Sequence, residues 1–152
     1  MANTLVKLYV HIVFHVKNTR ITMRKADLPR IFEYIGGILR NHNSMALAVG
    51  GIENHVHILM TLPKAQTLSD LVRTIKAVSS GWIKSIGPDY YNAFAWQNGY
   101  GAFSVSPSIL TKTINYINCQ EHHHKVKTYK EECKEFFDAY NIECDEKYIF
   151  DD

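Results

Sequence analysis

The sequence lacks the long apolar runs and paired cysteines that mark membrane-spanning and secreted proteins. No stretch approaches the roughly 18 consecutive apolar residues needed to cross a bilayer, and the apolar N-terminal segment is interrupted by Lys7, His11 and His15. Both features argue against membrane insertion and against secretion. The three cysteines are an odd number without C-x-x-C spacing, which is typical of reduced thiols in the cytosol. We therefore expect a cytoplasmic protein.

Repeats, low-complexity segments and linkers are also missing, and no phosphate-binding P-loop pattern is present. The 152 residues are 46% hydrophobic and 21% charged, a composition typical of a globular chain with a real core. We expect residues 1–152 to form a single domain, with no second domain and no nucleotide cofactor.

Charge is distributed unevenly along the chain. Residues 1–130 hold 15 Lys and Arg against 6 Asp and Glu, a net charge of +9, whereas residues 131–152 hold 2 against 9, a net charge of −7. A basic body rich in tyrosine suits a polyanion, because cations release counterions from phosphates and aromatic faces stack on bases. A solvated basic surface explains the charge alone equally well. The acidic segment has no assigned role at this level.

Hydrophobic periodicity predicts an α+β fold. Strict alternation over 4–16 indicates a strand with one core face, and residues 45–52 and 55–62 form the two strands of a predicted hairpin. Apolar residues recur at helical spacing over 26–41 and from Thr67 or Ser69 to about Ile86. Residues 93–105 indicate a strand or bent hairpin, Ser106 and Pro107 begin a helix to about His122, and a last helix covers 128–140. The order β-α-β-β-α-β is that of ferredoxin-like and RRM-like antiparallel sheets, with helices on one face and the C-terminal helices in addition.

Two histidines in the predicted hairpin form the sharpest local motif. On a strand His55 and His57 project from one face while Val56, Ile58 and Met60 enter the core, so both imidazoles can reach one metal ion. Two histidines on the solvated face of a sheet would produce the same H-x-H pattern. The motif by itself favours that simpler interpretation.

A second motif lies on the helix after Pro107. Tyr116 and Gln120 are four residues apart and project from one helical face, although packing of a tyrosine on the edge of the core explains them equally. Together with the histidines they describe a specific chemistry. Two imidazoles and the Gln120 amide oxygen would hold a divalent cation that polarises a phosphate, and the Tyr116 phenol would attack the phosphorus.

These residues resemble the single-tyrosine transposases of the HUH superfamily, which include the IS200-like and the REP-associated tyrosine transposases. The resemblance rests on His55-Val56-His57, on the string W-Q-N-G-Y-G-A-F-S-V-S at 96–106, and on Tyr116 with Gln120, in this order along nearly the whole chain. It implies His55, His57 and Gln120 as metal ligands and Tyr116 as nucleophile. The implied metal is Mg or Mn. Imidazole ligands alone do not favour these ions, but phosphate and water oxygens would fill the remaining coordination positions.

The resemblance also implies the function. We expect a DNA transposase that recognises hairpin single-stranded DNA and cleaves and rejoins it through a covalent 5′-phosphotyrosine. It implies a homodimer in which the tyrosine helix of one subunit completes the histidine site of the other, acting in a prokaryotic cytosol. Two alternatives remain open: an RRM-like module that binds hairpin nucleic acid without catalysis, and a hydrolase that activates water on His55 and His57.

Several basic and aromatic residues are candidates for DNA contact. The predicted loop after the first strand carries four of the candidate DNA-binding residues, and the second long helix carries the other two: Lys17, Arg20, Arg24, Lys25, Arg73 and Lys76. Trp96, Tyr100 and Phe103 could stack on bases, but aromatic residues in a strand are more often core. The run His122, His123 and His124 fans around a helix, so it favours a solvated helix end over a metal cluster.

Overall fold

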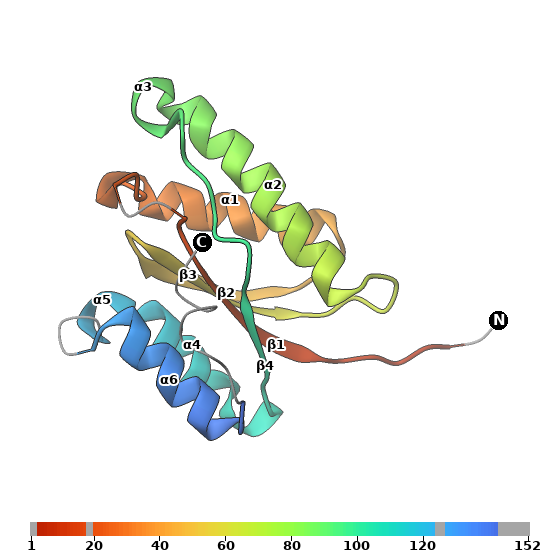
Figure 1. The fold of residues 1–152 in the computed structure, drawn as a ribbon. Coiled ribbons are helices and arrows are strands. Elements are labelled where there is room, and N and C mark those ends of the chain that lie inside the picture. The colour runs from red at the N-terminus through yellow and green to blue at the C-terminus, as the bar shows by residue number, and fades with distance from the viewer. Residues whose placement is uncertain (1–2, 18–19, 124–126, 143–152) are drawn as a thin grey trace.

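The computed structural model describes residues 3–17, 20–123 and 127–142, and its centre is a four-stranded sheet between two layers of helices (Figure 1). All paired strands are antiparallel, in the order β2-β3-β1-β4. The strands are β1 (Tyr9–His15), β2 (Ala46–Ile52), β3 (His55–Thr61) and β4 (Gly101–Ser104). The predicted α+β fold with a ferredoxin-like sheet is therefore confirmed.

Helices α1 (Leu28–Asn41) and α2 (Leu68–Ile86) cover one face of the sheet (Figure 1). A short 3-10 turn, η1 (Lys25–Asp27), leads into α1, and α3 (Pro88–Tyr91) follows α2. The Thr67 hydroxyl accepts a hydrogen bond from the Asp70 N–H and so caps α2 at the first of the two predicted positions. Apolar side chains from the two helices and from alternate positions of the central strands form the main core, which includes Ile12, Phe14, Val56, Ile58, Ile35 and Ile75.

The opposite face of the sheet is also covered, which the alternation in β1 did not predict. Helices α4 (Leu110–Asn118), α5 (Gln120–His123) and α6 (Tyr129–Ala139) lie against it, and η2 (Pro107–Ile109) leads into α4 (Figure 1). His11 and Val13, on the face of β1 away from the main core, are only 3% and 2% exposed. The approach is close at Gly50, where a Cβ atom would lie 2.5 Å from the carbonyl oxygen of Ile117.

Three element boundaries differ from the predictions. The first strand begins at Tyr9, where the paired strand β3 ends at Thr61, and Val6 and Leu8 before it are exposed. The strand or bent hairpin predicted over 93–105 is reduced to β4 and a single bridge between Val16 and Trp96. The helix predicted to continue to His122 is interrupted at Cys119, which has φ −108° and ψ 24°.

The hairpin strands, both long helices and the final helix agree with their predicted ranges within about two residues. Over the described ranges, none of the helices combines the length and apolarity required to span a membrane.

Candidate active site

Strand β3 places both histidines of the H-x-H motif beneath the C-terminal helices. His55 and His57 are fully buried, so the interpretation of the motif as a solvated sheet face is wrong. The Nδ1 atom of His55 lies 2.7 Å from the Asn54 side-chain oxygen, and Nδ1 of His57 lies 2.8 Å from Nε2 of His11 on β1. These contacts leave both Nε2 atoms directed away from the strand.

His11 supports this arrangement as a neutral ring. Burial, together with the adjacent His57, lowers the pKa of His11 from 6.5 to about 3. Nε2 of this neutral ring lies within hydrogen-bond distance of Nδ1 of His57, and this contact holds the His57 ring in its orientation. His11 was not predicted as a site residue, because the sequence indicates only that it lies on the same strand face as Val13.

Helix α4 brings Tyr116 to the same place. Its ring lies edge-on to His57, with 5.6 Å between ring centroids, and its hydroxyl donates a hydrogen bond to Oε2 of Glu132. Burial is the main cause that raises the pKa of the Tyr116 hydroxyl, and the hydrogen bond to Glu132 is the next. The phenol is therefore held in its protonated form in this arrangement.

Gln120 also reaches the histidines, but not from the continuous helix that the sequence predicts. It is the first residue of α5, after the interruption at Cys119, and its side chain is 1% exposed. The amide oxygen lies 3.2 Å from Nε2 of His55, and the amide nitrogen donates to the backbone oxygen of Tyr116. Four of the sequence-predicted site residues are thus brought together: His55, His57, Tyr116 and Gln120.

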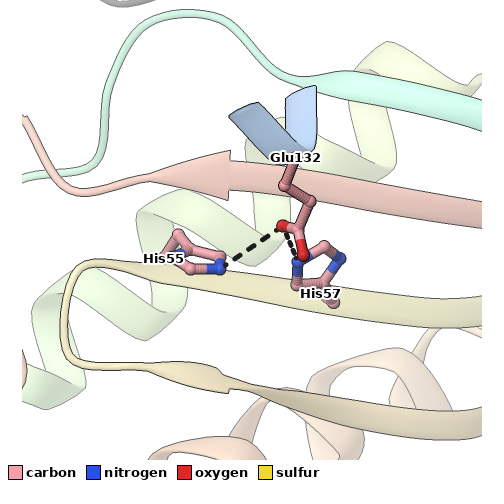
Figure 2. Close-up of side chains that lie close together, drawn as sticks. All are labelled: His55, His57 and Glu132. Atoms are coloured by element: carbon pink, nitrogen blue, oxygen red, sulfur yellow. Dashed lines mark hydrogen bonds and ion pairs between the residues drawn. The ribbon is translucent and has the colours of Figure 1, made fainter. Parts of the chain in front are cut away.

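The structure adds a residue that the sequence reasoning missed. Glu132 of α6 is 3% exposed, and its Oε1 lies 2.8 Å from Nε2 of His57 and 3.7 Å from Nε2 of His55 (Figure 2). In the sequence this residue belongs to the acidic segment, whose charge alone indicates no role. A signal is present nonetheless, since Tyr129, Cys133 and Phe136 place this carboxylate on an otherwise apolar stripe of the helix.

The assembled side chains suit a divalent cation. Ligand atoms of His55, His57 and Glu132 all lie within 4.8 Å of one another, and the Gln120 oxygen lies beside His55. Metal–ligand bonds of about 2.0–2.2 Å can bridge the 2.8 and 3.7 Å that separate Oε1 of Glu132 from Nε2 of His57 and of His55. In addition, oxygen acceptors face Nε2 of both histidines, an arrangement that is favourable only with a proton or a cation between the atoms.

Comparison with known proteins identifies the family. The sequence pattern of the family described as "Transposase IS200 like" matches residues 4–120. The chain belongs to the IS200-like transposase family. This confirms the resemblance drawn from the motifs, and the matched segment includes His55, His57, Tyr116 and Gln120 but ends before Glu132.

Solved structures share the fold of this transposase family member. A candidate transposase from Deinococcus radiodurans R1 is 18% identical, with a TM-score of 0.62 over 79% of this chain and 95% of that chain. A REP-associated tyrosine transposase bound to a REP hairpin is 16% identical, with a TM-score of 0.57 over 82% of this chain and 73% of that chain. No curated protein matches the chain.

A cleft of about 380 Å³ between α4 and α6 leads to the site of this family member. His11 and Tyr116 line it, together with residues that include Lys112, Glu135 and Tyr140. The cleft gives the phenol side of the site a route to the surface, while the histidines themselves are closed off.

The six basic candidates do not form one patch. Lys17 and Arg20 are exposed, Arg24 lies 4.1 Å above the Tyr90 ring, and Lys25 forms an ion pair with Glu121 of α5. Arg73 pairs with Asp70 on α2, one helical turn before it. The ammonium of Lys76 donates to the carbonyl oxygens of Gln97 and Gly99, so it positions the segment before β4.

The aromatic and histidine candidates also lie in different parts of the structure. Trp96 is core, with its Nε1 donating to the Ser79 hydroxyl, and Phe103 stacks on Phe136. Tyr100 is 38% exposed and lies with Arg73 and Lys76 along a second groove, of about 470 Å³. His122 is exposed on α5, and His123 ends that helix. His124 lies outside the described residues.

Proposed function

We propose that this family member is a metal-dependent transposase that recognises hairpin single-stranded DNA and cleaves and rejoins it through a covalent bond to Tyr116. One observation supports the proposal most strongly. The Tyr116 hydroxyl, two buried histidines and the side-chain oxygens of Gln120 and Glu132 lie together in one site. Membership of a transposase family supports a DNA-processing enzyme. Hairpin DNA as the substrate is supported by the structural relative that is bound to a REP hairpin and by the resemblance in the motifs.

The proposed reaction exchanges one ester for another. The Tyr116 oxygen forms a bond to the phosphorus, the bond to the 3′-oxygen of the preceding nucleotide breaks, and that oxygen leaves with a proton as a free 3′-hydroxyl. Rejoining is the reverse reaction with a different 3′-hydroxyl, so no nucleotide cofactor is needed.

Four of the polar side chains near the phenol have two different tasks. His55, His57 and Gln120 would hold the cation, and a Mg or Mn ion there would supply polarisation of the scissile phosphate. His11 orients His57 through the contact between its Nε2 and Nδ1 of His57. Since burial raises the pKa of Tyr116, the phenol has to lose its proton as the phosphate enters.

A denaturing gel with labelled hairpin DNA and Mg or Mn tests the proposal. We expect a covalent protein–DNA adduct with the wild-type chain and none with Tyr116→Phe, while hairpin binding is retained. Tyr34→Phe is the matched control, because Tyr34 stacks on Trp82 of α2, which covers the other face of the sheet, and should leave the adduct unchanged.

The alternatives give different outcomes in the same experiment. Tight hairpin binding with no adduct under either metal would favour an RRM-like binding module. Cleavage that survives in Tyr116→Phe would favour a hydrolase that activates water on the histidines.

We also propose that the chain forms a homodimer in which the tyrosine helix of one subunit acts at the histidine site of the other. This exchange can be tested directly. In the described chain Tyr116 contacts its own His57, so a single chain is able to bring both together, whereas the family resemblance implies exchange. Mixing Tyr116→Phe with His57→Ala chains distinguishes the two arrangements. An adduct in the mixture indicates action in trans, and its absence, with both variants dimeric, indicates action in cis.

The basic residues are proposed to bind the DNA backbone. The exposure of Lys17 and Arg20, and the position of Arg73, Lys76 and Tyr100 along one groove, support this. Arg24 and Lys25 lie beside the loop that carries the first two. Alanine variants should weaken hairpin binding and reduce its dependence on salt concentration, by about one unit of slope for each phosphate that is no longer neutralised.

A further inference from the structure

The described residues include one buried acidic side chain, Glu132, and it lies 12 positions beyond the segment that matches the family. A carboxylate is rarely buried without a partner, because removal from water costs several kcal/mol. Its position therefore needs an explanation that the family match does not supply.

Packing of α6 determines where this carboxylate lies. The Tyr129 ring lies 4.6 Å from the His55 ring, Phe136 stacks on Phe103 with 4.8 Å between centroids, and Cys133 is 4% exposed. These three residues, at positions i−3, i+1 and i+4 relative to Glu132, dock the helix on the sheet. Once they are docked, the carboxylate points into the histidine site (Figure 2).

Both carboxylate oxygens are used there. Oε1 faces Nε2 of His57 and of His55, and Oε2 accepts the hydrogen bond of the Tyr116 hydroxyl. The first oxygen is therefore placed among the atoms that would hold the cation, and the second connects the same side chain to the phenol.

We propose that Glu132 is a ligand of the metal centre, supplied by a helix outside the segment shared with the family. This deepens the proposed function and rests on it. An anionic oxygen neutralises part of the charge of a divalent ion and suits Mn or Mg better than imidazole does. Glu132 thus resolves the mismatch between an H-x-H pair and these hard cations. It also couples ion binding to the docking of α6.

Binding of Mn²⁺ to the full-length chain without DNA tests the ligand role. Electron paramagnetic resonance measures free Mn²⁺, and we expect one bound ion in the wild-type protein. Glu132→Ala should weaken Mn²⁺ binding by more than the roughly 10–100-fold that loss of a group behind a ligand costs, and Glu132→Asp should restore part of the loss. Asp138→Asn is the matched control, since Asp138 is exposed on the same helix and its substitution removes the same charge.

A selectivity measurement separates a ligand from a merely structural residue. Competition between Mn²⁺ and Zn²⁺ should shift towards Zn²⁺ in Glu132→Ala, because the two imidazoles that remain favour the softer ion. Circular dichroism and thermal melting of each variant establish that α6 and the sheet are still folded. A change in stability alone would not alter the ratio of the two affinities.

Three outcomes would overturn the proposal. They are absence of Mn²⁺ binding in the wild-type chain, wild-type Mn²⁺ affinity in a folded Glu132→Ala protein, and an equal loss of affinity in Asp138→Asn. Because no DNA is present, these results are independent of strand transfer. Wild-type Mn²⁺ affinity in Glu132→Ala with a normal Tyr116 adduct would remove Glu132 from the metal site and leave the proposed function standing. Mn²⁺ binding that depends on Glu132, with no Tyr116 adduct, would keep Glu132 as a metal ligand and overturn the proposed function.

Discussion

The two faces of the sheet are both buried, but they are buried in opposite ways. Beneath α1 and α2 the strands contribute side chains such as Ile12, Phe14 and Ile58, which are apolar and fully buried. Beneath α4, α5 and α6 the same strands contribute His11 and His57 as well as apolar groups. Strand alternation separates the two sets, because successive residues point to opposite faces.

This difference shows how a small protein can tolerate buried titratable groups. The apolar face holds the main hydrophobic cluster, and each Å² of apolar surface that it removes from water contributes about 25 cal/mol. The polar face is satisfied internally: in the parts of the chain that the structure describes, every buried side-chain nitrogen or oxygen has a hydrogen-bond partner. We infer that stability is concentrated on one face and chemistry on the other.

The largest expected effect is loss of an aromatic ring from the apolar face. Phe14→Ala should lower the free energy of unfolding by about 3–5 kcal/mol, because the ring is fully buried and packs edge-on against Trp96. Urea denaturation measures the change. Phe103→Ala is the control on the other face, where we expect a smaller loss because Phe103 lies on an edge strand and α6 can repack. Equal losses would contradict the proposed asymmetry.

A methyl group added between the sheet and α4 should have the next largest effect. In Gly50→Ala the new Cβ meets the Ile117 carbonyl oxygen at 2.5 Å, so α4 has to move, at a cost of about 1–3 kcal/mol. Because Tyr116 is the preceding residue, formation of the covalent adduct should fall as well.

The same substitution at Gly81 is the matched control. It lies in α2, where a Cβ atom meets nothing within 4 Å, and Gly81→Ala should stabilise the helix by about 0.5–1 kcal/mol with no effect on the adduct. A Gly50→Ala protein with wild-type stability and adduct yield would show that α4 is not held against β2.

The smallest expected effect concerns a polar group beside the apolar core. The Tyr91 hydroxyl donates to Asp27 at 2.6 Å and accepts from the Arg24 N–H at 2.8 Å. Tyr91→Phe should cost about 1–2 kcal/mol near pH 8. Burial, and then the hydrogen bond to Asp27, raises the pKa of Tyr91 from 10.0 to about 12.

The sign of the pH dependence follows from this shift. The contribution of the hydroxyl is complete below pH 10 and is lost as the pH rises towards about 12, because the unfolded chain releases the proton first. The stability difference between wild type and Tyr91→Phe should therefore shrink over this range, as measured by urea denaturation at several pH values. A constant difference would show that the hydroxyl is not linked to folding.

Prediction from the sequence was most successful where local pattern decides the outcome. The period of two over β3 places Val56, Ile58 and Met60 in the core and the two histidines on the other face, as observed. The helical stripes of α1 and α2 were likewise predictable, and the cap of α2 was narrowed to Thr67 or Ser69, because these features depend on neighbours within a few residues.

The site was only partly predictable. Its family motif identified His55, His57, Tyr116 and Gln120, and the structure brings these four residues together. The interruption at Cys119 was not foreseen, although it changes how Gln120 reaches His55. Neither the burial of the histidines nor their approach to Glu132 has a local signature sufficient to predict it.

The sequence by itself determined the strands, the long helices, the family and the residues of its motif, since each depends on side-chain type and spacing along the chain. Only the tertiary structure decided that the second face of the sheet is closed and that Glu132 joins the site. The two residues Glu132 and His57 are 75 positions apart, and what brings them together is the packing of α6 on the sheet. A buried charge takes its partners from the fold around it, so its role becomes visible only when the whole chain is folded.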